Sequence, residues 1–400
     1  MSCLDTTTEE AAAARASAGR LLLGGFLTFA MVMGIGRFIY TPLLPLMRDE
    51  YGLEPGLLGL LASLNFVGYF VGSAIGIVLA RGQPRLWGLR VGVVSSVATT
   101  AAMGLTDDIG LWMVWRTLSG VASAVAMLSA AGIVSEALAR IEDSGRVGWL
   151  FGGVGFGIAL SGTLVRLTSD TFDSSGLWLL GAAVCGLMLP VVLAEVRERD
   201  LPVRRRAQRR QRRVPRPLPL VPLVVNYTCE GLGYSVFVTF IVAIVKARPG
   251  GEVLGDWVWV IVGLSALPAC LLWMQAAERI GFATALMLAY TAQVVAVLLP
   301  VLSTSGAAAV AAAILFGGTF TAISALTLPL GRHGGGGRGF AILTVFFGMG
   351  QIAGPAAAGY MAELSPRFDF STALVASAGV LILGQVFLAY AMATRRDVGG

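Results

Sequence analysis

The chain carries twelve apolar stretches, each long enough to cross a lipid bilayer as a helix. A helix needs about 20 mostly apolar residues for this, and backbone groups left unsatisfied in hydrocarbon cost several kcal/mol each. The short alternating segments of a membrane β-barrel are absent. A hydrophobic content of 56%, a charged content of 13% and a mean hydropathy of +0.79 exclude an ordinary soluble protein. We therefore predict an all-α membrane protein with spans at residues 21–47, 57–79, 86–105, 110–138, 147–168, 176–196, 219–246, 257–277, 282–302, 306–330, 339–363 and 371–393.

The second half of the chain repeats the beginning of the first. Residues 34–41 read Gly-Ile-Gly-Arg-Phe-Ile-Tyr-Thr, and residues 231–238, which follow 197 positions later, read Gly-Leu-Gly-Tyr-Ser-Val-Phe-Val. Between the halves lies the segment 197–216, in which ten of twenty residues are arginine. We predict a duplicated protein with an N-terminal tail (1–20), a six-helix bundle (21–196), an arginine-rich linker (197–218), a second, pseudo-symmetric six-helix bundle (219–393) and a C-terminal tail (394–400).

The distribution of lysine and arginine predicts which side of the membrane each loop occupies. An even number of spans places both termini on one side, and 22 of the 29 basic residues fall on that side, against five on the other. Because cytoplasmic loops carry the excess of positive charge, we expect a multi-pass protein of the bacterial inner membrane with both termini in the cytoplasm. Anionic lipid attracts the linker, so we interpret it as an anchor and tether rather than as a nucleic-acid-binding segment.

Arg37 lies near the middle of the first predicted span. Burying an arginine at that depth costs roughly 2.5 to 3.5 kcal/mol on insertion scales, so such a residue usually faces a cavity or a partner. Helical spacing places Tyr40 and Thr41 on the same face, a combination suited to a carboxylate, a phosphate or another acceptor. A structural arginine paired with a neighbouring helix is the alternative. Pro42 and Pro45 should bend this span.

Glu230 is the only acid well inside the predicted membrane zone, and it opens the second half of the chain. The proton affinity of an isolated carboxylate in a low dielectric should respond to water access and to nearby cations, as a proton-coupling group requires. Tyr227 and Tyr234 share its face by three- and four-residue spacing. A permanently protonated or arginine-paired structural acid is the alternative.

Further charged residues lie near the ends of spans. Arg116, early in the fourth span, is either a functional cation or an arginine whose side chain reaches the interface. Glu136 and Arg140 stand four residues apart in the favourable order for an ion pair. An ordinary solvated charge cluster explains each of the cytoplasmic residues as well as a gate does, because exposed pairs contribute only about 0 to 1 kcal/mol. The candidate residues of a cytoplasmic gate are Arg81, Glu136, Arg140, Glu278 and Arg279.

The sequence offers little material for chemistry on a substrate. His333 is the only histidine, and the four cysteines show neither pairing nor metal-ligand spacing. The glycine-rich segment 331–338 lacks the Lys-Ser/Thr end of a phosphate loop, and the glycines of 153–157 lie inside an apolar span. We therefore expect no enzyme, no metal site and no cofactor.

Three segments make the chain resemble the major facilitator superfamily and, within it, the bacterial YbfB/YjiJ family. They are residues 34–47, residues 229–234 (Cys-Glu-Gly-Leu-Gly-Tyr) and residues 350–359 (Gly-Gln-Ile-Ala-Gly-Pro-Ala-Ala-Ala-Gly). The resemblance extends over all twelve spans. It implies two six-helix bundles around a central cavity, with spans 1, 4, 7 and 10 innermost, and alternating access by rocking.

The resemblance also bears on single motifs. Arg116 with Gly120 is similar to the arginine motif of span four, which is associated with proton coupling. The loop at residues 80–85 lacks the aspartate of the superfamily signature after span two, which weakens the expectation of a gate there. Span five, at residues 153–162, lacks the proline that drug/proton antiporters carry, which weakens an assignment to that class.

Together these features predict a secondary transporter that moves a small organic molecule, with anions among the candidates, by proton-coupled alternating access. Export is favoured over uptake only because efflux is frequent in the superfamily. Proton symport of a small organic anion and a non-transporting sensor or assembly partner are the alternatives. We expect a monomer whose partners are the substrate, protons and the bilayer, with no nucleic acid. The expected substrate-binding residues are Arg37, Tyr40, Thr41, Asn65, Tyr234 and Gln351, and the expected proton-coupling residues are Glu230 and Arg116.

Overall fold

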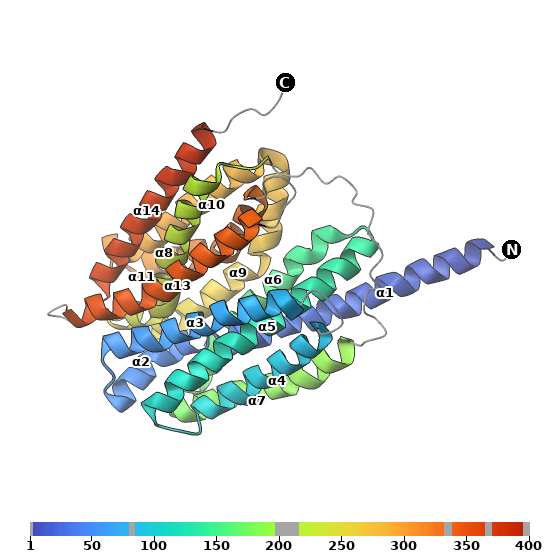
Figure 1. Ribbon diagram of the computed structural model, residues 1–400. Helices are drawn as coiled ribbons and strands as arrows, with labels where there is room; N and C mark the ends of the chain where they lie inside the picture. The colour runs from blue at the N-terminus through green and yellow to red at the C-terminus, as the bar shows by residue number, and fades with distance from the viewer. Residues whose placement is uncertain (1–2, 80–84, 197–215, 332–337, 365–369, 395–400) are drawn as a thin grey trace.

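The computed structural model describes residues 3–79, 85–196, 216–331, 338–364 and 370–394 (Figure 1). Every regular element in these ranges is a helix. The first half contains α1 (Cys3–Phe29), the π-helix η1 (Ala30–Ile35), α2 (Tyr40–Tyr51), α3 (Pro55–Leu79), α4 (Arg85–Met103), α5 (Ile109–Arg140), the short 3₁₀ helix η2 (Ser144–Arg146), α6 (Val147–Thr168) and α7 (Ser174–Glu195). The second half contains α8 (Leu220–Lys246), α9 (Glu252–Ile280), α10 (Phe282–Leu302), α11 (Gly306–Gly317), α12 (Phe320–Leu330), α13 (Arg338–Leu364) and α14 (Ser371–Ala393).

Within the described ranges, twelve helical segments are long and apolar enough to cross a membrane, which confirms the predicted all-α class. Span one (Ala13–Tyr51) combines α1, η1 and α2, and span ten (Gly306–Leu330) combines α11 and α12. The other spans are single helices. Two of the predicted innermost spans are therefore interrupted in the middle.

The predicted tails and linker are described only in part. Helix α1 begins at Cys3, inside the segment 1–20, and Ala18 is already buried. The N–H of Leu218 donates to Leu330 O at 3.0 Å, which holds the end of the linker against the second bundle. Residues 197–215 and 395–400 lie outside the described residues.

Span one is interrupted one turn before Pro42, which lacks a backbone donor. The N–H groups of Gly36 and Phe38 donate five residues back, to Met31 O at 2.7 Å and Met33 O at 3.1 Å, the pattern of a π-helix. Residues 36–39 then form a turn before α2 begins. The prolines are thus preceded by a π-helical segment and a turn, across which Ile39 N–H still donates to Ile35 O at 3.0 Å, so the span changes its hydrogen-bond pattern here.

Two bundles, α1–α7 and α8–α14, pack along two seams, α3 against α13 and α6 against α9 (Figure 1). Glycines let the backbones approach closely in both seams. A Cβ atom on Gly59 of α3 would lie 2.2 Å from Pro355 O, and one on Gly263 of α9 would lie 2.2 Å from Ala159 N. Small residues allow membrane helices to make such close contacts, so a larger side chain at either glycine would force the bundles apart.

A hydrogen bond between the bundles marks their symmetry. Thr41 Oγ1 on α2 donates to Val238 O on α8 at 2.8 Å. These residues are 197 positions apart, the offset of the sequence repeat. Equivalent residues of two halves can touch only near the axis that relates them, so a pseudo-two-fold axis passes between spans one and seven here. Arg37 and Tyr234 share the same offset and interact electrostatically.

The two ends of the bundle interface differ. We call the end where α1 begins and α14 ends the terminal side, and the other end the opposite side. In Figure 1 the bundles diverge toward the terminal side, and a cavity of about 370 Å³ lies between them there. It is lined by Ser135, Gly145, Val147, Gly148, Phe151, Cys270, Met274, Ala325, Leu328, Pro329 and Phe340. Nearer the opposite side, the Thr41 contact and a bond from Ala356 N to Ser63 Oγ at 2.9 Å join the bundles. This conformation is therefore open toward the terminal side.

Candidate functional site

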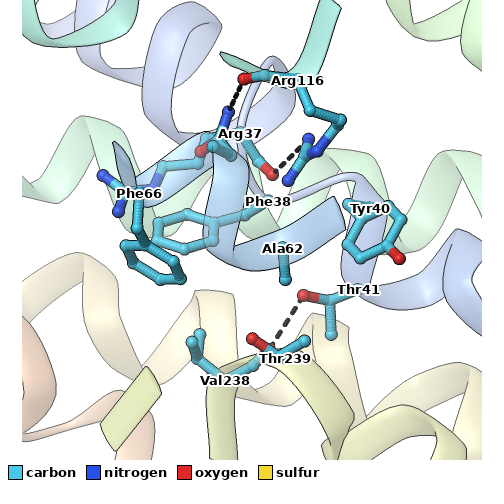
Figure 2. Close-up of a pocket in the computed structure, with 10 residues that line it drawn as sticks. Arg37, Phe38, Tyr40, Thr41, Ala62, Phe66, Arg116, Val238 and Thr239 are labelled. Carbon is cyan, nitrogen blue, oxygen red and sulfur yellow. Dashed lines mark hydrogen bonds between the residues drawn. The ribbon is translucent and has the colours of Figure 1, made fainter. Parts of the chain in front are cut away.

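Arg37 lies in the turn that breaks span one, and only 3% of its surface is exposed. Its guanidinium carbon lies 4.3 Å from the ring centre of Phe66 and 4.2 Å from that of Tyr69, both on α3, and 5.3 Å from that of Phe38. Rings at these distances stabilise a cation through their π faces. Figure 2 shows Arg37 extending toward Phe66. Aromatic rings thus hold the cation inside the protein.

Two nitrogen atoms of the Arg37 guanidinium are left without a hydrogen bond by the described residues. Nη1 makes a long contact of 3.9 Å with Met33 Sδ, while Nε and Nη2 are buried and have no partner of hydrogen-bond geometry in this part of the chain. The polar group beside the guanidinium is the hydroxyl of Tyr69, which interacts with it electrostatically and donates to Met127 Sδ at 3.5 Å. In a planar guanidinium the N–H bonds of Nε and Nη2 point the same way and form the fork that takes both oxygens of a carboxylate. No carbonyl or acid among the described residues occupies this fork. The geometry suits a ligand that brings two adjacent acceptors.

Arg116 on α5 is equally buried but has a different environment. Its Nε donates to Leu61 O and its Nη1 to Arg37 O, both at 3.4 Å, and its guanidinium carbon lies 4.5 Å from the ring centre of Tyr40. The carbonyl of Arg37 lies in the turn of span one, where the helical hydrogen-bond pattern is interrupted. Arg116 therefore holds the broken helix against α3 and α5. The described contacts give it no acid with which to exchange a proton.

A small cavity gathers most of the predicted substrate-binding residues (Figure 2). It is lined by Arg37, Phe38, Tyr40, Thr41, Ala62, Asn65, Phe66, Arg116, Val238 and Thr239. Its volume is about 10 Å³, room for roughly one water molecule. Tyr40 and Asn65 use their donors on carbonyl groups, Leu58 O at 2.9 Å and Arg116 O at 3.0 Å. The cavity is too small for an organic substrate in this conformation, and the unpaired donors beside it belong to Arg37.

Tyr234 and Gln351 extend the site into the second bundle. Gln351 Nε2 on α13 donates to the hydroxyl of Tyr234 on α8. The ring of Tyr234 stacks on Phe347, with ring centres 5.7 Å apart, and on Phe320, with ring centres 6.3 Å apart. Because Tyr234 also interacts electrostatically with Arg37, predicted residues from both bundles meet near the symmetry axis.

Glu230 faces the interior of the second bundle. Only 1% of its surface is exposed, and its Oε1 accepts a hydrogen bond of 2.6 Å from Gln293 Nε2 on α10. Its Oε2 has no hydrogen-bond partner among the residues that the structure describes. The neighbouring Tyr227 stacks instead on Phe347 of α13 with ring centres 4.2 Å apart. Tyrosine and acid therefore occupy adjacent flanks of α8, and the carboxylate lies on a different flank from the one that meets Arg37.

Sequence reasoning missed two polar residues beside Glu230. Gln293 is fully buried, and its Oε1 accepts from Thr319 Oγ1 at 3.2 Å. Thr319 lies at the break between α11 and α12. A buried amide in the otherwise apolar span nine, and a Gly-Gly-Thr sequence in the middle of span ten, were the signals that could have revealed them.

The predicted gate residues are only partly brought together. Glu136 Oε2 pairs with Arg85 Nη1 at 2.5 Å, while Arg140 is exposed on the last turn of α5. Glu278 and Arg279 are exposed at the end of α9. Arg81 lies outside the described residues. The i,i+4 spacing that drew attention to Glu136 thus led to a residue whose partner comes from another helix.

An ion cluster that the sequence did not reveal lies on the opposite side. Asp256 Oδ1 accepts from Lys246 Nζ at 2.6 Å, and Asp256 Oδ2 lies 3.6 Å from Arg166 Nε, an ion pair that crosses from α9 to α6 of the other bundle. We call Arg166, Lys246 and Asp256 the opposite-side ion cluster. Nearby, Arg248 donates to Pro300 O and to Ser303 O, and partial burial lowers the pKa of this guanidinium.

Comparison with known proteins agrees with this architecture. Residues 29–389 match the family described as "Uncharacterised MFS-type transporter YbfB". A curated relative, the uncharacterized MFS-type transporter YceJ of Bacillus subtilis (strain 168), is 27% identical over 181 residues. That match spans 43% of each chain, so this chain covers less than half of that relative's length.

Solved structures of transporters have the same fold. A mutant of the nucleoside transporter NupG aligns with a TM-score of 0.71 and 14% identity, over 95% of this chain and 100% of that one. A bacterial homolog of the human lysosomal transporter Spinster, in an inward-facing and occupied conformation, aligns with a TM-score of 0.69 and 15% identity, over 94% and 96%. These similarities establish the fold, while the family match covers nearly all twelve spans. The chain therefore belongs to the YbfB-like family of major facilitator superfamily transporters, which are secondary transporters and not enzymes.

Proposed function

We propose that the protein is a proton-coupled transporter of a small organic anion that carries a carboxylate. The observation that carries this proposal is the vacant fork of Arg37 between the two bundles. A buried donor without an acceptor costs about 1 to 3 kcal/mol, and more when it is charged. A substrate carboxylate that fills both positions offsets this cost when it binds, which favours anions over neutral molecules of the same shape.

The surroundings of Arg37 favour a substrate with a flat apolar body. Phe66 and Tyr69 lie against the guanidinium, and Tyr234 with its stacked partner Phe320 approaches from the other bundle. Aromatic faces of this kind pack well against a ring or a short apolar chain. The hydroxyl of Tyr234, hydrogen-bonded by Gln351, adds a polar group close to the cation. A small aromatic carboxylate satisfies all these groups.

Glu230 is the proposed proton site. Its buried Oε2 has no hydrogen-bond partner, so it can take up a proton without breaking a contact. The hydrogen bond to Glu230 Oε1 comes from the uncharged amide of Gln293 rather than from an arginine. The charge of Glu230 can therefore change during the cycle without leaving a buried cation unpaired. This argument favours a titrating acid over the arginine-paired alternative.

The distribution of basic residues supports an orientation in the bacterial inner membrane with the terminal side in the cytoplasm. In that orientation the cavity of about 370 Å³ opens toward the cytoplasm, and the opposite-side ion cluster closes the outer end. Alternating access then requires the seams to close on the terminal side as the ion cluster separates. The glycine contacts of α3 with α13 and α6 with α9 are suited to such rocking.

Matched ligands can test the proposal. Purified protein is heated with benzoate, benzamide or benzylamine, which share a ring and differ in charge. We expect benzoate alone to raise the melting temperature, because only it fills the fork of Arg37, and we expect Arg37→Met to abolish that shift. Equal stabilisation by the neutral or cationic compound, or a benzoate shift that survives in Arg37→Met, would contradict the proposal.

Flux measurements test the coupling. In vesicles that contain a pH-sensitive dye, labelled benzoate uptake and lumenal pH are followed after subtraction of the passive flux into protein-free vesicles. We expect Glu230→Gln to lose proton movement while it retains exchange of labelled benzoate at equal pH, and we expect Glu252→Gln, a change at an exposed acid of α9, to behave as wild type. The direction of the pH gradient that drives accumulation distinguishes export, which we favour, from symport. Proton movement that persists in Glu230→Gln would exclude this acid as the coupling site.

A further inference from the structure

A continuous hydrogen-bonded chain connects Glu230 to the break in span ten. Gln293 Nε2 donates to Glu230 Oε1 at 2.6 Å, and Gln293 Oε1 accepts from Thr319 Oγ1 at 3.2 Å. All three side chains are at most 2% exposed and come from three different spans. A buried chain of this kind has few alternative partners, so a change at one end must be accommodated along its length.

Thr319 sits where span ten loses its helical pattern. Helix α11 ends at Gly317, α12 begins at Phe320, and Thr319 itself has φ −130° and ψ −38°. Its hydroxyl has three acceptors within reach, Leu315 O at 2.7 Å, Phe316 O at 3.1 Å and Gln293 Oε1 at 3.2 Å. One hydroxyl carries one proton and cannot serve all three, so these contacts compete.

The protonation state of Glu230 decides which contact wins. A charged carboxylate only accepts, so the amide of Gln293 points its NH₂ group at Glu230 and its oxygen at Thr319, which draws the hydroxyl proton away from α11. A protonated carboxyl can donate to the amide oxygen, and the amide then turns its NH₂ group toward Thr319. The hydroxyl now accepts from Gln293 and gives its proton to Leu315 O. The hydrogen bonds of the last turn of α11 thus depend on whether Glu230 is protonated, although Glu230 reaches this turn only through Gln293 and Thr319.

The break is also connected to the anion site. Phe320, directly after Thr319, stacks on Tyr234 with ring centres 6.3 Å apart and meets Phe38 edge-on at 6.4 Å. Phe38 follows Arg37 and lies in the first bundle. On the other side of the break, Trp273 Nε1 on α9 donates to Gly318 O at 2.7 Å. A change at Thr319 therefore reaches an aromatic contact between the two bundles.

We infer that Gln293 and Thr319 are positioning residues that transmit the protonation state of Glu230 to the break in span ten, and through Phe320 to the anion site. This inference rests on the proposed function, because it takes Glu230 as the proton site. It explains how an acid that does not touch Arg37 can control a site beside it. The bistable element is the last turn of α11, whose carbonyls gain or lose the hydroxyl of Thr319.

Within the described part of the chain, no charged side chain competes with Glu230 for protons. The titratable groups that interact electrostatically with it are Tyr227, Cys229 and Tyr234 of its own helix and Tyr290 of α10, which are uncharged near pH 7. Among the described residues of α2, α9, α12, α13 and α14, which pack against α8, no charged side chain is bonded to the carboxylate. A pH response at the break is thus traceable to Glu230.

The full-length protein in lipid nanodiscs allows a test that needs no substrate. Tryptophan is replaced biosynthetically by 5-fluorotryptophan, and the ¹⁹F resonance of Trp273, assigned with Trp273→Phe, is followed as a function of pH. Infrared difference spectra over the same range report the carbonyl stretch of a protonated carboxyl group, assigned by its loss in Glu230→Gln. The infrared signal reports the proton site, and the fluorine signal reports the break.

We expect the Trp273 resonance to shift with the same midpoint as the infrared band in wild type. The shift should be lost in Gln293→Met and in Thr319→Val, which keep side-chain size but remove the hydrogen bonds, while the infrared band persists. It should survive in Thr319→Ser, which restores the hydroxyl, and in Thr327→Val, a matched change at a buried threonine of α12 whose hydroxyl bonds to its own helix.

Each outcome separates the inference from the proposed function. An infrared band without a Trp273 shift, or a shift that survives in both Gln293→Met and Thr319→Val, overturns the inference and leaves Glu230 as a proton site. Absence of the infrared band overturns the proposed proton site and the inference with it. If Gln293→Met fails to fold, the pair Thr319→Val and Thr319→Ser still decides the result.

Discussion

Arg37 and Arg116 are a matched pair for testing which buried guanidinium has unpaired hydrogen-bond donors and which one holds neighbouring helices together. Both are 3% exposed, both lie in apolar spans, and each lies over at least one aromatic ring. They differ in their hydrogen bonds, because Arg37 has two unpaired nitrogen atoms and Arg116 donates to two carbonyl groups. Replacing each by methionine, which has a similar length and no charge, should therefore change the free energy of unfolding in opposite directions.

The magnitudes follow from these contacts. In Arg37→Met two unpaired buried donors disappear, a gain of about 1 to 3 kcal/mol each. The lost contacts with Phe38, Phe66 and Tyr69 cost about 0.5 to 2 kcal/mol each, and contacts of the new sulfur with the rings recover about 0.3 to 1.5 kcal/mol of this loss. The free energy of unfolding of this variant should therefore exceed that of wild type by about 1 kcal/mol. In Arg116→Met two carbonyl groups lose their donor, and because both contacts are long, at 3.4 Å, each loss should lie in the lower half of the range of about 1 to 3 kcal/mol, so the variant should lose about 3 kcal/mol.

Thermal melting of the purified variants in one detergent measures the difference. At about 2 to 4 °C per kcal/mol, Arg116→Met should melt about 6 to 12 °C below wild type, and Arg37→Met should melt at or slightly above it. The anion response should disappear in Arg37→Met despite its stability. A loss of stability in Arg37→Met as large as that in Arg116→Met would show that Arg37 has a structural partner, and the argument from its vacant fork would fail.

Three further changes test other parts of the structure. Asp256→Asn removes both ion pairs of the opposite-side ion cluster. Spin labels on the terminal ends of the two bundles should then move closer as the opposite side opens, and unchanged distances would show that the ion cluster does not hold that side closed. Gly263→Ala places a Cβ 2.2 Å from the backbone of the other bundle and should lower the free energy of unfolding by about 1 to 3 kcal/mol. Gly379→Ala meets nothing within 4 Å inside α14 and should leave the free energy of unfolding unchanged or raise it by up to about 1 kcal/mol, so similar losses in the two variants would contradict the close contact of α6 with α9. Glu136→Gln breaks the partly buried pair with α4 and should lower the melting temperature more than Arg140→Gln, and the reverse order would argue against that pair.

Much of the fold could be predicted because the bilayer imposes local rules on the chain. Span lengths, the excess of basic residues and the repeat offset are properties of contiguous sequence, and the twelve spans followed from them. Pro42 predicted a bend in span one, because it has no N–H for the carbonyl four residues earlier, and the π-helix and turn of span one lie directly before it. The break at Gly318 has no proline beside it, and it depends on the contacts of Trp273 and Thr319 with neighbouring helices.

The site was predicted less completely, for a physical reason that Glu230 illustrates. Helical spacing placed it on one face of α8 with Tyr227 and Tyr234. In the structure this face contacts two different helices, α13 and α10. The tyrosines pack toward α13 and the acid toward α10. Gln293, which completes the environment of Glu230, lies 63 residues away, and no local period connects the two.

By itself the sequence determined that this chain forms twelve membrane helices in two related halves, since in lipid a backbone satisfies its polar groups only in helices or closed β-barrels, and these stretches are too long and too continuously apolar for barrel strands. It also marked Arg37, Arg116 and Glu230, because a charge inside an apolar span is costly wherever it points. Only the tertiary structure decided which of these charges is satisfied. The carbonyls that hold Arg116, the rings that flank Arg37 and the amide that meets Glu230 all come from other helices. Such partners are chosen by packing rather than by local sequence.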